Sequence, residues 1–525
     1  MSASEASLAR GSTRLFAAKV FFLGAGLVQQ VLLPNALGLE GYGMLSRVLA
    51  PLNVVNNVAV GASMQSASRA TAAGTPSLGV VLRVQIAIAL AVVAALVVAA
   101  PLVSSFQHAP AILAPLRLGA ALCGLYVVYA ALVGVLNGRQ SFAAQAGLDV
   151  TAATLRTAGL VGGGVLGARL LGSGPLGAVA GTVFAGGSMV VIAALLVRPR
   201  DVFSASNDGT RALVTGIAAL AGAQLVTNLL LQVDVVLLGR VFALRSMAPG
   251  EADRSIGVYR ACQLFSLLPY QLVASISLTL FPLVANVHSR GGHRELQRLV
   301  RRGLRMGVLL ATLLVGVVVS APGPLLRLTF GAEVARLGID VLRPLATAQA
   351  LLVVGALAST VLVALGQTRR ATLAGASGLA VIVGGTLGIG TGEHALRGMA
   401  LWLGAGFALQ AFLAFAFLVR AVPRALPWST FARAALVIGV AFELPSSAEG
   451  PRAAALVVAP AAGLAVLATL ALAGEWSGAD YKRLGALVRS RLGRPPAPPS
   501  RRWVVSAEPV RRRAQARKTR RRSMR

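Results

Sequence analysis

The chain has 525 residues, of which 56% are hydrophobic and only 13% are charged, and its mean hydropathy is +0.75. A water-soluble surface needs more charge than this, so the composition excludes an ordinary soluble protein. The net charge of +32 invites a nucleic-acid hypothesis, but much of that charge lies in loops and in one C-terminal tail, which argues against specific nucleic-acid recognition.

Apolar runs of about twenty residues recur from one end of the sequence to the other, and each can cross a bilayer as an α-helix. They do not alternate as the strands of a membrane β-barrel would. The runs predict an all-α polytopic membrane protein with about fourteen transmembrane helices. The spans are expected over residues 14–37, 42–64, 79–103, 111–136, 143–168, 174–197, 211–238, 254–287, 303–322, 339–365, 371–391, 397–419, 430–446 and 453–473.

The spans group into an N-terminal six-helix lobe over residues 1–205, a C-terminal six-helix lobe over 206–425 and an extra helix pair over 426–475. Residues 476–525 contain prolines and arginine blocks, and we expect a disordered, basic, cytoplasmic tail. Two interpretations of the tail carry equal weight. Either it binds anionic membrane lipids or an acidic partner such as a glycan-assembly enzyme, or it only fixes topology in an arginine-biased chain.

Arginines mark every second loop, and short loops with this bias stay in the cytoplasm. The pattern puts the N-terminus and the C-terminal tail of this multi-pass protein in the cytoplasm. One loop on the other side of the membrane also contains arginines, but Glu251 and Asp253 in that loop lower its net positive charge. The marked loops contain Arg69, Arg83, Arg139, Arg198, Arg200, Arg211, Arg290, Arg294, Arg298, Arg369, Arg370, Arg420 and Arg424.

Two helix pairs contain similar elements in the same order. The first pair has Leu37-Gly38, Gly41-Tyr42-Gly43 and Pro51, and the later pair has Leu238-Gly239, Gly257-Val258-Tyr259 and Pro269. A six-span period keeps the orientation, so we expect two parallel repeats related by an axis along the membrane normal, with a substrate path between them. This arrangement favours a transporter over a membrane-bound enzyme.

Further patterns lie at residues 26–43, at 134–142 (GVLNGRQSF), at 232–239 (QVDVVLLG), at 257–269 and at Phe281-Pro282. With them the chain resembles the oligosaccharide-lipid flippases of the O-antigen and capsule type, in the multidrug/oligosaccharidyl-lipid/polysaccharide exporter superfamily. The resemblance implies a transporter, not an enzyme, of the bacterial cytoplasmic (inner) membrane. It would flip polyprenyl-diphosphate-linked oligosaccharides by alternating access for cell-surface polysaccharides such as lipopolysaccharide.

Three alternatives stay open. Lipid II flippases of the superfamily usually have paired arginines after a Pro-Asn element in the second helix, whereas this chain has Asn56 and Asn57 there. Multidrug or organic-cation antiporters commonly use embedded carboxylates, and the first span has none. A membrane glycan polymerase or ligase is less favoured, because the loops are short. No cofactor is expected, and Cys123 and Cys262 indicate neither a disulfide framework nor a metal site.

Charged side chains inside the spans cost about 2.5 to 3.5 kcal/mol each, so they usually face a cavity or a partner. Because guanidinium binds phosphate through two parallel hydrogen bonds, we predict that Arg47, Arg260 and Arg156 bind the diphosphate. Each residue also has an alternative role. Arg47 could extend to the outer headgroups, and Arg260 could form an ion pair with Asp234. Arg156 and Asp149 could satisfy each other through water. The side chains expected to line the cavity or to take part in coupling are Asp149, Asp234, Asn56, Asn57, Gln232 and Gln263, with interhelical hydrogen bonding as their alternative role.

Overall fold

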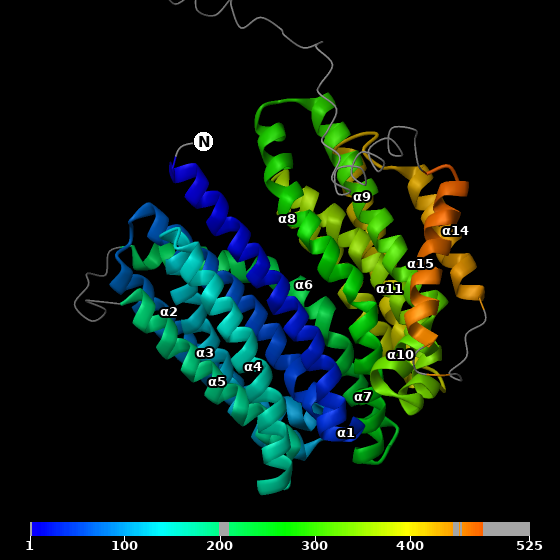
Figure 1. Cartoon of the computed structure of the whole chain (residues 1–525), viewed down its shortest axis with the longest axis horizontal. Coiled ribbons are helices and arrows are strands. Elements are labelled where there is room, and N and C mark those ends of the chain that lie inside the picture. Colours follow the sequence, from blue (N-terminus) through cyan, green and yellow to red (C-terminus); the bar gives the residue numbers. More distant parts are fainter. Residues whose placement is uncertain (1–2, 199–208, 445–450, 452–453, 476–525) are drawn as a thin grey trace, which may run out of the picture. The chain divides into compact units, whose positions relative to one another are not determined.

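The computed structural model describes residues 3–198, 209–444, 451 and 454–475. Its contacts separate Met1–Leu470 from Ala471–Arg525, and the packing discussed here belongs to the first of these units (Figure 1). The predicted basic tail over residues 476–525 lies outside the described residues.

The described part of the chain is helical and contains no strand, as the apolar runs predict. The helices are α1 (Ala3–Ala73), α2 (Leu78–Phe106), the short η1 (Pro110–Ile112), α3 (Leu113–Gly138), α4 (Phe142–Leu170), α5 (Gly174–Val197), α6 (Thr210–Leu244), α7 (Pro249–Ser266), α8 (Leu268–Ser289), α9 (His293–Ser320), α10 (Pro322–Phe330), α11 (Ala332–Ala364), α12 (Thr368–Gly384) with the π-turn η2 (Gly385–Ile389), α13 (Ala395–Ala421), α14 (Trp428–Glu443) and α15 (Ala455–Leu472).

The first two predicted spans both lie in α1, which consists of two helical segments joined at Gly38. The backbone of Gly38 has φ 70° and ψ 170°, a conformation outside the helical region that glycine adopts at little cost. The Leu37-Gly38 element of the predicted repeat therefore marks the sharp change in direction between the two segments.

The predicted span over residues 254–287 is divided into α7 and α8, which meet at Leu267. Pro269 is the second residue of α8, and a proline there removes a backbone donor that a continuous helix would use. The nine-residue helix α10 was not predicted, because its sequence is shorter than a membrane span.

Eleven helical stretches among the described residues are long and apolar enough to cross a membrane. This number counts the two segments of α1 as one stretch. It omits the more polar α4 and also α14, which has only 16 residues. The all-helical, multi-pass character is confirmed, whereas the count of fourteen is not.

The apolar core is divided between two sets of helices. Two clusters of buried side chains come mainly from α1–α5, which we call the first helix group. The two others come mainly from α6–α13, the second helix group. The groups contact each other chiefly where α1 packs on α6 and α7. The lobe boundary predicted near residue 205 stays a prediction, since residues 199–208 lie outside the described part.

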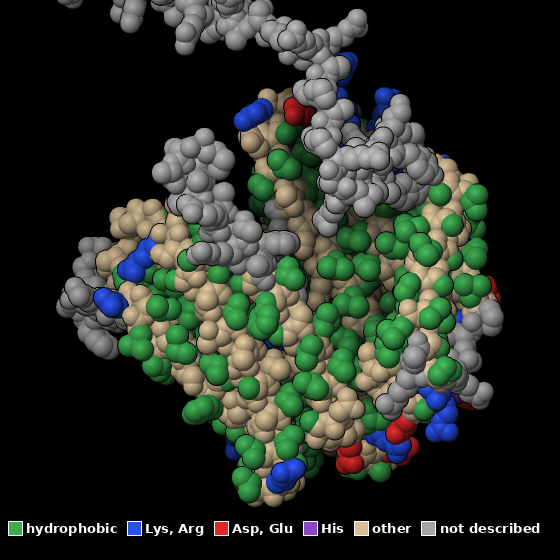
Figure 2. All heavy atoms as spheres, in the orientation of Figure 1, with side chains coloured by type: hydrophobic (Ala, Val, Ile, Leu, Met, Phe, Trp, Pro, Cys, Tyr) green, Lys and Arg blue, Asp and Glu red, His purple; other side chains and the backbone are tan. Residues whose placement is uncertain are grey.

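Large apolar side chains are exposed along the outer faces of the helices, as in Leu90, Val98 and Leu102 of α2, Phe184 of α5 and Phe412 of α13. Figure 2 shows arginine side chains gathered toward the ends of the helices, with apolar and uncharged surface between them. This is the surface of a protein whose middle is solvated by lipid.

Candidate functional site

The two helix groups come closest where α1 packs on α7, at Gly43 and Gly257. A Cβ atom at Gly43 would overlap the backbone carbonyl of Asp253, and one at Gly257 would overlap the carbonyl of Leu39. Only glycine allows this backbone contact. The glycine elements of the predicted repeat therefore pack on each other, at the end of the helices that contains Gly38. We call this the kink end.

Arg47 joins three elements at the kink end. Its Nη1 lies 2.7 Å from a carboxylate oxygen of Asp253 on α7. Its Nε donates to the Gln107 side chain at 3.1 Å, and its Nη2 donates to the Gln107 backbone carbonyl at 2.6 Å. Only 3% of the Arg47 side chain is exposed, so it does not extend to lipid headgroups. In this conformation Arg47 links the helix groups and lines none of the described pockets.

Asp234 and Arg260, from α6 and α7, are connected without forming a direct ion pair. The Asp234 carboxylate accepts hydrogen bonds from the Tyr259 hydroxyl at 2.9 Å, from the Gln263 side chain, and from the Val235 backbone N–H at 2.8 Å. Arg260 donates to the other end of the Gln263 amide at 2.6 Å. The predicted coupling residues Asp234 and Gln263 thus form one network that orients Arg260.

The guanidinium of Arg260 also lies close to the hydroxyl of Tyr42 in the first helix group. Tyr42 is buried and donates to Gln30 of α1 at 2.8 Å. Arg260 itself is half-buried, whereas Asp234 is almost completely buried. The Arg260 charge is therefore held where the two helix groups meet.

A cavity of about 270 Å³ lies among α1, α3, α4 and α5, and three of the predicted residues line it. Arg156 is exposed there, and Asn56 and Asn57 come from α1. Tyr126 and Tyr129 of α3 add aromatic faces. The side-chain oxygen of Asn56 is buried without a hydrogen-bond partner among the described residues. We call this the Arg156 cavity. It offers one cation, amides and phenol hydroxyls to a ligand.

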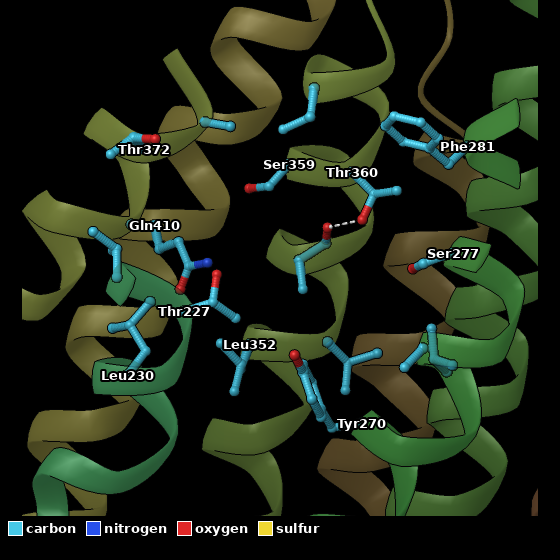
Figure 3. Close-up of a pocket in the computed structure, with 18 of the residues that line it drawn as sticks. Thr227, Leu230, Tyr270, Ser277, Phe281, Leu352, Ser359, Thr360, Thr372 and Gln410 are labelled. Atoms are coloured by element: carbon cyan, nitrogen blue, oxygen red, sulfur yellow. Dashed lines mark hydrogen bonds between the residues drawn. The ribbon is translucent and has the colours of Figure 1, made fainter. Parts of the chain in front are cut away.

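A pocket of about 420 Å³ in the second helix group was not predicted (Figure 3). It lies among α6, α8, α11, α12 and α13. Its polar lining consists of hydroxyls and one amide, residue types that are ordinary in membrane helices, so no sequence signal distinguished them. We call it the hydroxyl pocket, and its polar lining includes Thr227, Ser277, Ser359, Thr360, Thr372 and Gln410.

The two remaining predicted residues line neither the Arg156 cavity nor the hydroxyl pocket. Asp149 is buried in α4, whereas Arg156 on the same helix is exposed to the cavity, so the two differ in environment. Gln232 is half-buried on α6, and its side-chain oxygen has no partner among the described residues. No three His, Cys, Asp or Glu side chains in the described part come together as metal ligands.

The fold is that of the transporters of the MOP superfamily. The structure is similar to lipid II flippase MurJ in an inward closed conformation, with a TM-score of 0.65 and 15% identity, over 91% of this chain and 99% of that protein. It is also similar to a multidrug resistance MATE family transporter in an inward-facing conformation, with a TM-score of 0.60 and 15% identity, over 76% of this chain and 94% of that one. A third similar structure is a MOP superfamily transporter from Pyrococcus furiosus, with a TM-score of 0.54 and 15% identity, over 80% of this chain and 96% of that one.

The sequence identifies the family within this class. The model of the polysaccharide biosynthesis protein family matches residues 31–335, which is more than half of the chain, so the chain belongs to that family. No curated protein sequence matches the chain significantly.

Proposed function

We propose that this multi-pass membrane protein flips a polyprenyl-diphosphate-linked oligosaccharide across the bacterial cytoplasmic membrane, for the synthesis of a cell-surface polysaccharide. The two helix groups would open alternately at the kink end and at the opposite end. The diphosphate would be bound by arginines between and within the groups, while the polyprenyl chain stays in lipid.

The observation that carries this proposal is the state of Arg260. The carboxylate of Asp234, which is connected to Arg260 through Gln263, is already bonded to Tyr259, Gln263 and a backbone N–H, and Arg260 forms no direct ion pair among the described residues. A cation so placed is costly in a membrane protein unless it faces water, a polar partner or a bound anion. Guanidinium and diphosphate suit each other in geometry and charge.

Arg156 supplies a second cation to the same cargo. It lines the Arg156 cavity beside Asn56 and Asn57, and it forms no ion pair with a described residue. Amides next to a guanidinium can donate to phosphate oxygens or to the first sugar. Arg47 stays a predicted diphosphate ligand only for a conformation in which its bond to Asp253 is broken.

The test is leaflet exchange in liposomes that contain the full chain and a fluorescent polyprenyl-diphosphate disaccharide. Protein-dependent exchange is expected for the parent, with about a 10-fold to 100-fold loss in Arg260→Ala and in Arg156→Ala. Arg260→Lys keeps the charge but not the paired donors, so it should recover only part of the rate.

Arg254→Ala is the matched control, because Arg254 lies on the same helix but its ion pair with Glu333 is exposed. It should keep the parent rate. If the parent moves small organic cations and not the lipid-linked probe, the protein is an antiporter and the proposal is wrong. Equal exchange in the parent and both alanine variants would refute the arginine site.

A further inference from the structure

The hydroxyl pocket differs from the Arg156 cavity in the charge of its lining. None of the described residues that line it is charged. A diphosphate or an acidic sugar would be desolvated there without a counter-charge, and a cation would lack a carboxylate. The pocket is therefore suited to an uncharged ligand. Its volume of about 420 Å³ falls in the range of small-molecule sites.

Two polar groups of the pocket have unused hydrogen-bonding capacity. The side-chain oxygen of Gln410 on α13 and the hydroxyl of Ser359 on α11 are buried without a partner among the described residues. Gln410 is only 5% exposed. Figure 3 shows both groups directed into the space that Thr372 also faces. Buried polar atoms without partners are costly, so these positions favour a ligand that brings hydroxyl or amide groups.

Aromatic side chains complete the pocket on the α8 side. Tyr270 and Phe281 lie across from Thr372 and Gln410 in Figure 3. Phe281 is 41% exposed, so its ring is accessible. One face of a pyranose ring is apolar and the rim is hydroxylated, and an aromatic face opposite an amide matches that division.

The hydroxyl pocket and the Arg156 cavity begin next to the same helix contact. A Cβ atom at Gly61 of α1 would overlap the side-chain amide of Gln224 on α6. Asn57 of the Arg156 cavity lies one turn from Gly61, and Thr227 of the hydroxyl pocket lies one turn from Gln224. A ligand with one charged and one uncharged part could thus have each part bound in a different helix group.

We infer that the hydroxyl pocket binds an uncharged sugar unit of the cargo whose diphosphate is bound by the arginines. This rests on the proposed flippase function for the identity of the cargo. The pocket would select for glycans with a neutral hexose or N-acetylhexosamine and against those with an acidic sugar at that position.

The experiment uses the full chain in liposomes and three probes. Two are polyprenyl-diphosphate N-acetylhexosaminyl-hexose and sugar-free polyprenyl diphosphate, both followed by leaflet exchange. The third carries a diazirine on the hexose, and its photoadducts are mapped by mass spectrometry. We expect adducts on pocket-lining residues such as Ala356, Thr372 and Gly375. Excess neutral disaccharide should suppress them.

Gln410→Leu and Ser359→Ala should each reduce exchange of the glycosylated probe by about fivefold to tenfold and leave the sugar-free probe within about twofold. Gln349→Leu is the matched control: Gln349 is 2% exposed on α11, its side-chain oxygen also lacks a partner among the described residues, and it does not line the pocket. It should affect both probes equally.

Three results would overturn the inference. The first is adducts confined to other helices, and the second is an equal loss of exchange for both lipid probes in Gln410→Leu. The third is labelling that a small organic cation suppresses and the disaccharide does not. The flippase proposal fails separately. Pocket labelling in a parent that exchanges neither lipid probe would support a sugar site in a protein that is not a flippase, whereas exchange with labelling elsewhere would leave a flippase without this site.

Discussion

Arg47 and Asp253 are separated by more than two hundred residues in the sequence, yet they form a buried ion pair that no local pattern reveals. The sequence predicts that Asp253 is a loop residue that offsets the charge of nearby arginines. The structure places it in α7, where it pairs with Arg47. Each buried charge loses its hydration, and only the opposite charge of its partner offsets that cost. Removing one partner therefore destabilises the protein more than replacing both by apolar residues.

We therefore predict that Arg47→Ala lowers the stability by about 3 to 5 kcal/mol, because Asp253 and Gln107 lose their partner. The melting temperature of the purified protein in detergent measures the effect. The double variant Arg47→Met with Asp253→Leu should recover much of the loss. Arg254→Ala breaks an exposed pair and should cost no more than about 1 kcal/mol. A melting temperature unchanged by Arg47→Ala would contradict the structural role of this pair.

A second prediction at this scale concerns Gly43. Gly43→Ala places a methyl group against the Asp253 backbone carbonyl, so α1 and α7 must separate. Faster hydrogen exchange in α7 is expected, measured by mass spectrometry on the protein in detergent. Gly26→Ala is the control, because no atom outside its own helix lies within 4 Å of the added methyl group. Equal rates of hydrogen exchange in α7 of the two variants would mean that the glycine contact does not hold the kink end closed.

At the scale of the element, apolar periodicity located the helices but not their interruptions. The sequence predicts one span over residues 254–287, and only the position of Pro269 hints that α7 and α8 are separate. The Arg156 cavity could be predicted in part, since an arginine and two asparagines inside spans are unusual. The hydroxyl pocket could not, because its serines and threonines become a site only when α8, α11 and α13 are packed together.

The contact between α1 and α7 predicts a way to stop the transport cycle. Glu40 of α1 lies against Gly250 at the start of α7. In a chain whose buried Cys123 and Cys262 are replaced by alanine, Glu40→Cys and Gly250→Cys should be joined by a short cleavable thiol crosslinker. Exchange of the lipid-linked probe should then stop and return on reduction, since the kink end can no longer open.

The single-cysteine variants treated with the same reagent are the controls, and they should keep their exchange activity. Continued exchange in the crosslinked double variant would show that transport does not require opening at the kink end. In that case the alternating-access mechanism proposed above would need a different moving element.

For the whole molecule, the distribution of charge predicts orientation. The α8–α9 turn and the first turns of α9 expose Arg290, Arg294, Arg298, Arg301 and Arg302. At the kink end, arginines are accompanied by acids, as in the pairs Arg47–Asp253 and Arg254–Glu333. Because uncompensated arginines stay on the cytoplasmic side, the α8–α9 end and the N-terminus should face the cytoplasm.

Single cysteines test this orientation in the background without Cys123 and Cys262. Ser289 and Ser246 are both exposed, at the α8–α9 end and at the kink end respectively. Ser289→Cys should react with a membrane-impermeant thiol reagent only in inverted vesicles, and Ser246→Cys only in intact spheroplasts. The reverse pattern would invert the topology. Arg260 and Arg156 would then receive the cargo from the outer face, which is incompatible with the export proposed above.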